Sequence, residues 1–168
     1  MTLACAALSA AEVQTGMPTD SLCAATEQVV FSCELKARKR VALCAMAGFS
    51  STGAQLQYRF GTSDKLEFRY PEAATYGKSP FYYSATGYSG GGESHIRFAN
   101  GEHDYILFER TVQAESGGKK QARFSSGVIV RKNKKVISVR SCLTGGGLQM
   151  EMDALLPEEA FEYLDELP

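Results

Sequence analysis

The chain has 168 residues, of which 44% are hydrophobic and 22% are charged. This length suits one domain with a core of its own, and the composition excludes an intrinsically disordered protein. The formal net charge is −1, and the basic residues form no recognisable nucleic-acid-binding motif, so we expect no nucleic-acid partner.

Charge is divided unevenly along the chain. All 18 Lys and Arg residues lie between Lys36 and Arg140, whereas seven of the 19 acidic residues follow Arg140. We therefore expect the acidic C-terminal stretch either to dock on a mildly basic body or to offset its charge.

The first eleven residues, MTLACAALSAA, are small and apolar and end in an A-x-A-like run. Such a stretch is typical of the end of a signal peptide, so we interpret residues 1–11 as a signal-peptide remnant and residues 12–28 as an N-terminal arm. This interpretation predicts a periplasmic or secreted protein. Two alternatives stay open. In the first, Cys5 is lipidated and the chain is an outer-membrane lipoprotein, the one case in which we expect membrane attachment. In the second, the chain is cytosolic and its first residues are merely apolar.

Four further cysteines fit export, because an even number of thiols indicates disulfide bonds in an oxidising compartment. They are Cys23, Cys33, Cys44 and Cys142. A two-residue turn within 36–40 would place Cys33 opposite Cys44, which favours a disulfide between those two; the competing arrangement joins Cys23 or Cys44 to Cys142. The spacing fits no zinc motif, and we expect no metal and no cofactor.

From residue 29 onward, short β-prone runs alternate with turn residues. They predict a mainly β fold, an antiparallel meander of about eight strands forming a sandwich or barrel, in a single domain over 29–168. Asn100-Gly101 is the strongest turn signal, because a tight hairpin needs residues that accept positive φ. The predicted strands are 29–35, 40–46, 55–60, 65–70, 94–99, 104–112, 123–131 and 135–142.

One short acidic helix is expected at the C-terminus, over 157–167. Pro157 suits a first helical turn, acidic residues follow it, and Phe161 and Leu164 fall on one side. We expect those two side chains to pack on the sheet after a hinge of three glycines at 145–147.

The segment 71–93 is the strongest candidate for a binding site. It is rich in tyrosine, glycine and serine, a composition typical of recognition loops on a β scaffold. The alternative is a further strand at 81–83 with buried rings. The residues predicted to bind a protein partner are Tyr76, Phe81, Tyr82, Tyr83 and Tyr88.

Catalytic residues form no recognisable set. The G-x-S-x-G pattern at 87–91 is followed by a strand, whereas a nucleophile elbow leads into a helix. We therefore predict an exported, non-enzymatic β domain that binds a macromolecular partner, such as an inhibitor or immunity protein of a secreted enzyme. The alternatives are a structural envelope lipoprotein and a small envelope hydrolase that uses Glu93, His103 or Asp104.

Overall fold

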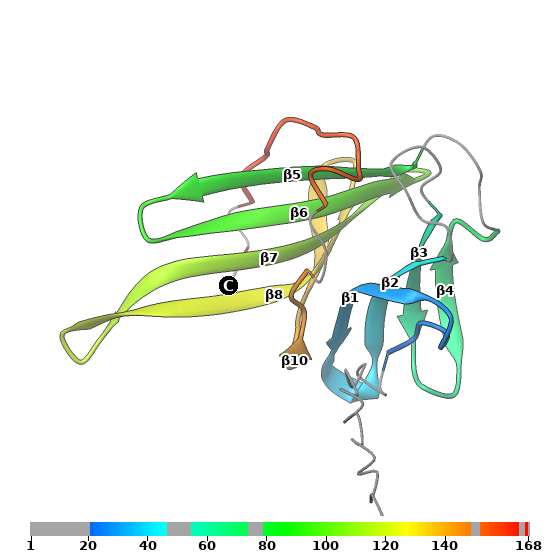
Figure 1. Cartoon of the computed structure of the whole chain (residues 1–168), viewed down its shortest axis with the longest axis horizontal. Helices are drawn as coiled ribbons and strands as arrows, with labels where there is room; N and C mark the ends of the chain where they lie inside the picture. The colour runs from blue at the N-terminus through cyan, green and yellow to red at the C-terminus, as the bar shows by residue number, and fades with distance from the viewer. Residues whose placement is uncertain (1–20, 47–54, 74–78, 149–151, 165–166, 168) are drawn as a thin grey trace, which may run out of the picture.

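The computed structural model describes residues 21–46, 55–73, 79–148, 152–164 and 167. These residues form two antiparallel sheets of five strands each (Figure 1). The first sheet has the order β10-β1-β2-β3-β4 and contains β1 (Gln28–Glu34), β2 (Arg40–Ala45), β3 (Leu56–Gly61), β4 (Leu66–Tyr70) and β10 (Thr144–Gly145). The second has the order β5-β6-β7-β8-β9 and contains β5 (Phe81–Tyr88), β6 (Gly91–Asn100), β7 (His103–Ser116), β8 (Lys119–Lys132) and β9 (Lys135–Ser141). The mainly β prediction is confirmed, and each of the eight predicted strands is present.

The two sheets share one apolar core, which is consistent with the predicted sandwich. Phe98 of β6 is fully buried. Its ring lies 5.0 Å from that of Tyr58 on β3 and 4.7 Å from that of Tyr70 on β4. Such aromatic pairs add to the free energy gained by burying their surface. Tyr105, directly opposite Phe98 on β7, extends the same cluster.

The prediction of a loop over 71–93 is wrong for residues 81–88 and 91–93. Residues 81–88 form β5, which pairs with β6 along its whole length, and residues 91–93 begin β6. Aromatic and β-branched residues fit a pleated sheet, and Gly90 adopts the positive φ of 81° that the turn between the strands requires. The alternative of a further strand is therefore the correct one.

The predicted C-terminal helix is also wrong, because the described residues from 157 to 164 contain no helix. The Tyr83 N–H of β5 donates to Pro157 O at 3.0 Å, and the Glu159 N–H donates back to Tyr83 O at 2.9 Å. This segment thereby adds a short parallel bridge beside β5. Helix propensity is a weak preference, and the unpaired edge of β5 offers backbone partners that outweigh it.

The four predicted cysteines form two disulfides, Cys23–Cys44 and Cys33–Cys142. The favoured Cys33–Cys44 pairing is wrong because the connection from β1 to β2 has five residues, which places Cys33 opposite Val41. Cys33–Cys142 links β1 of the first sheet to the end of β9 in the second. Two disulfides indicate an oxidising, non-cytoplasmic compartment.

Candidate functional site

The outer face of the second sheet, turned away from the first, carries charged and buried polar side chains. Side chains alternate between the two faces of a strand, so every second residue of paired β6, β7 and β8 lies on this face. Glu93, His95 and Arg131 are only 6%, 4% and 4% exposed. Charged groups are seldom buried unless they are paired, so this face is chemically the most unusual part of the described chain. We call the following set the outer-face cluster: Glu93, His95, Arg97, Asp104, Arg110 and Arg131.

The C-terminal segment, residues 157–164 with Leu167, lies over this cluster (Figure 1). Arg97 Nε donates to the Glu159 carboxylate at 2.8 Å, and Arg131 Nη1 lies 2.8 Å from Glu162 Oε1. Leu164 and Leu167 pack against apolar side chains of β7 and β8. The expected docking of the acidic stretch on the basic body is therefore confirmed, although the segment is extended.

His95 lies at the centre of the cluster. Its Nε2–H donates to Glu93 Oε1 at 2.6 Å, and the Phe161 ring of the C-terminal segment stacks on the imidazole with the ring centres 4.7 Å apart. Burial lowers the pKa of His95, and the hydrogen bond to Glu93 opposes this shift without cancelling it. The imidazole is therefore neutral at pH 7. The expected packing of Phe161 on the sheet is confirmed by this stack.

A cavity of about 320 Å³ remains between the C-terminal segment and the sheet. Its lining includes His95, Arg97 and Arg131 of the sheet and Lys134 of the turn between β8 and β9. Asp104 lies between the two arginines, accepting from Arg97 Nη1 at 3.1 Å and from Arg131 Nη2 at 3.3 Å. Arg131 Nε is buried and has no hydrogen-bond acceptor in the described part of the chain.

The residues predicted to bind a partner do not form one surface. Phe81 is in the core with no exposed area, and the Tyr82 ring packs against the Arg97 guanidinium, 5.3 Å away. The Tyr83 hydroxyl donates to Ser94 at 3.4 Å, and the Tyr88 hydroxyl donates to the Gly92 carbonyl at 3.2 Å. Tyr76 lies outside the described residues.

The residues of the alternative hydrolase site are likewise not brought together. His103 and Asp104 are neighbours on β7, so their side chains point to opposite faces, and Asp104 is held by arginines. Glu93 instead contacts His95. Sequence reasoning missed the outer-face cluster, although its signal was present: ionisable residues recur at 93, 95 and 97, every second position of one strand.

Two hairpins project beyond the first sheet (Figure 1). β6 pairs with β7 as far as Gly92 opposite Thr111. Beyond that point β7 and β8 pair with each other from Val112, opposite Arg123, to the turn after Ser116. We call residues 112–123 the projecting ribbon. At its base Phe124 is 53% exposed, beside a hollow of about 540 Å³.

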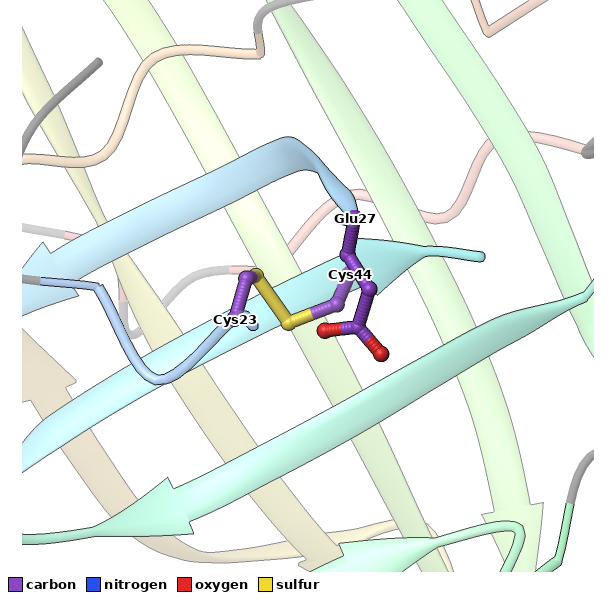
Figure 2. A group of neighbouring side chains, drawn as sticks. All are labelled: Cys23, Glu27 and Cys44. Atoms are coloured by element: carbon purple, nitrogen blue, oxygen red, sulfur yellow. A yellow bond between two sulfur atoms is a disulfide. The ribbon is translucent and has the colours of Figure 1, made fainter. Parts of the chain in front are cut away.

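A third group lies at the other end of the molecule, where Cys23, Glu27 and Cys44 have their ligand atoms within 4.8 Å of one another (Figure 2). Both sulfurs belong to a disulfide, so the group offers no thiolate to a metal ion. Burial raises the pKa of Glu27, but hydrogen bonds from Arg59 and from the Ala24 amide outweigh it and hold that pKa below its usual range. The group fastens residues 22–27 to the first sheet.

The fold and the cross-links define a mainly β, disulfide-linked protein with a covered polar face and projecting hairpins. Comparison of the chain with protein-family models, with curated proteins and with solved structures gives no match. Among the described residues, no helix is long and apolar enough to cross a membrane.

Proposed function

We propose that the protein is an exported binding protein that recognises another macromolecule through the projecting ribbon. The observation that carries this proposal is the length of β7 and β8, 14 residues each, against five to seven in β1–β4. A two-stranded hairpin is at best marginally stable in water by itself. A ribbon that extends beyond the core adds little to the stability of the sandwich, so its length favours a role in contact with a partner.

The chemistry of the ribbon indicates the kind of partner. The ribbon is basic: it contains one acidic residue, Glu115, and three basic residues, Lys119, Lys120 and Arg123. Exposed Phe124 adds a large apolar group beside these charges, and aromatic groups near arginine are typical of interface centres. An acidic protein surface is complementary to this pattern, and the opposite charges would speed association.

Two disulfides and the signal-like start support a periplasmic or secreted location. The tyrosines at 82, 83 and 88 have structural roles in β5 and its turn, so we move the predicted contact surface to the neighbouring ribbon. A rigid β scaffold with a projecting hairpin suits an inhibitor or immunity protein, because such a hairpin can enter the active-site cleft of a secreted enzyme.

Capture from the native envelope tests the proposal. In the test variant, K119A/K120A/R123A, the ribbon loses three positive charges. The control variant, K36A/K65A/R69A, loses three exposed charges from β4 and from the connections between strands of the first sheet. We expect wild type and control to retain a stoichiometric partner, identified by mass spectrometry, and the ribbon variant to lose it. Equal retention by both variants would show that the ribbon is not the contact surface, and the absence of any partner would remove the proposal.

A further inference from the structure

The C-terminal segment lies on the outer face as a bound peptide lies in a groove. Its backbone pairs with Tyr83 of β5, its carboxylates meet Arg97 and Arg131, and its Phe161 stacks on His95. Peptide recognition by strand addition works in this way: main-chain hydrogen bonds hold the strand, and pockets for alternate side chains select its sequence. The face therefore has the components of a peptide-binding site.

The segment fills this groove incompletely. The cavity of about 320 Å³ lies beneath it, and buried Arg131 keeps an Nε–H that finds no acceptor in the described chain. A buried donor without a partner costs free energy. Lys134 also lines the cavity. A ligand with one more carboxylate or carbonyl oxygen than the segment presents would fit these donors better.

The attachment of the segment is also suited to exchange. Two backbone hydrogen bonds join its described part to β5. The ion pair of Arg97 with Glu159 is about a quarter exposed, with side chains 25% and 23% accessible. Partly exposed ion pairs contribute little free energy, so a competing strand needs to supply little binding free energy to displace this one.

We propose that the outer face of the second sheet is a binding groove for an extended acidic peptide of a partner protein, and that the C-terminal segment occupies it in cis. The segment itself gives the pattern that the groove accepts: two glutamates three residues apart, an aromatic residue between them and a leucine after them. This groove is separate from the projecting ribbon and is tested by a different readout.

The test uses a fluorescent peptide with the sequence of residues 155–168 and the full-length protein. In wild type the tethered segment competes at a high effective concentration, so the free peptide binds weakly. E159Q/E162Q weakens the tethered copy and opens the groove. We expect this variant to bind the peptide about tenfold or more tightly than wild type by fluorescence anisotropy, because losing the tethered competitor raises the apparent affinity.

Two controls make the test specific. D153N/E158Q removes two exposed carboxylates and is expected to bind the peptide as wild type does. Adding R97A to E159Q/E162Q is expected to abolish the gain, because the groove then lacks the guanidinium that holds the first glutamate. A gain that survives R97A, or a folded E159Q/E162Q variant that binds no better than wild type, would overturn the proposal.

Light scattering tests the other possible occupant of the groove, which is the C-terminal segment of a second copy of the chain. We expect the protein to be a monomer with and without its glutamates. A wild-type dimer that E159Q/E162Q dissociates would assign the groove to exchanged C-terminal segments. Peptide binding is measured without the captured partner, so failure here leaves the ribbon proposal standing, and failure of capture leaves this one standing.

Discussion

Arg97 and Glu159, 62 positions apart in the chain, form a two-pronged ion pair across the edge of the second sheet. Arg97 Nε donates to both carboxylate oxygens, at 2.8 and 3.0 Å, and Nη2 donates to Oε2 at 2.5 Å. The hydrogen bond with Glu159 raises the pKa of Arg97, which stays charged at every pH at which the protein folds. Asp104 holds the same guanidinium from β7. This pair fixes where the C-terminal segment crosses the sheet.

Removal of this carboxylate by E159Q is expected to lower the free energy of unfolding by about 1 kcal/mol, since the pair is partly exposed. Hydrogen exchange at the Glu159 amide should accelerate more than exchange in β6, because the segment detaches locally. E158Q removes the adjacent, exposed charge and serves as the control. Equal effects of E158Q and E159Q, measured by urea unfolding and hydrogen exchange, would contradict this assignment.

The strands were predictable because their signals are local. On β6, Ile96 and Phe98 alternate with His95 and Arg97, so one buried face is visible in the sequence. Their partners on β7 are Leu107 and Tyr105, which lie on the same face. The turn lies one residue later than expected, with Asn100 opposite His103 and Gly101 at a φ of 60°. The same side chains face inward in both arrangements.

The remaining features depend on contacts between distant segments. Tyrosine, glycine and serine suit both a recognition loop and a strand, and the position of Phe81 opposite Phe98 decides between them. Phe161 and Leu164 are spaced for a helix face, yet His95 and the unpaired edge of β5 draw them into an extended segment. The disulfide Cys33–Cys142 spans 109 positions, and no local pattern reveals such a pair.

The two disulfides are expected to differ in their contribution to stability. In the chain-entropy account a cross-link stabilises by constraining the unfolded chain, and more so for a longer loop. The Cys33–Cys142 loop spans 109 positions, whereas Cys23–Cys44 spans 21. Replacing both cysteines by alanine should cost about 5 kcal/mol in the first case and about 3 kcal/mol in the second. Urea unfolding of the two double variants measures the difference. A larger loss of unfolding free energy for the Cys23–Cys44 variant would contradict this prediction.

Phe98 is expected to be one of the most sensitive core positions. It is fully buried and lies among the rings of Tyr58, Tyr70 and Phe81. Truncation by F98A leaves a cavity and should lower the free energy of unfolding by about 3–5 kcal/mol. F124A removes the same ring from a site that is 53% exposed and should change stability by less than about 0.5 kcal/mol. A similar loss for both variants in chemical unfolding would contradict the placement of Phe98.

Buried His95 is expected to make the protein less stable in acid. Its folded-state pKa lies below the ordinary value of 6.5, so the unfolded chain takes up the proton first as the pH falls. Stability therefore drops below about pH 6.5, by at most about 1.4 kcal/mol per pH unit for one proton, until the folded-state pKa is passed. The groups that face this imidazole are Glu93, Arg131 and Glu159.

The variant H95Q keeps a polar group of similar size but has no proton to take up. The stability advantage of wild type over H95Q should therefore shrink as the pH falls from about 7.5 to about 5.5, measured by urea unfolding at each pH. H103Q removes the other histidine of the chain and is the control for the comparison. If the difference between wild type and H95Q grew on acidification, the folded protein would be the form that binds the proton. The buried His95–Glu93 pair would then be charged, contrary to the effect of burial described above.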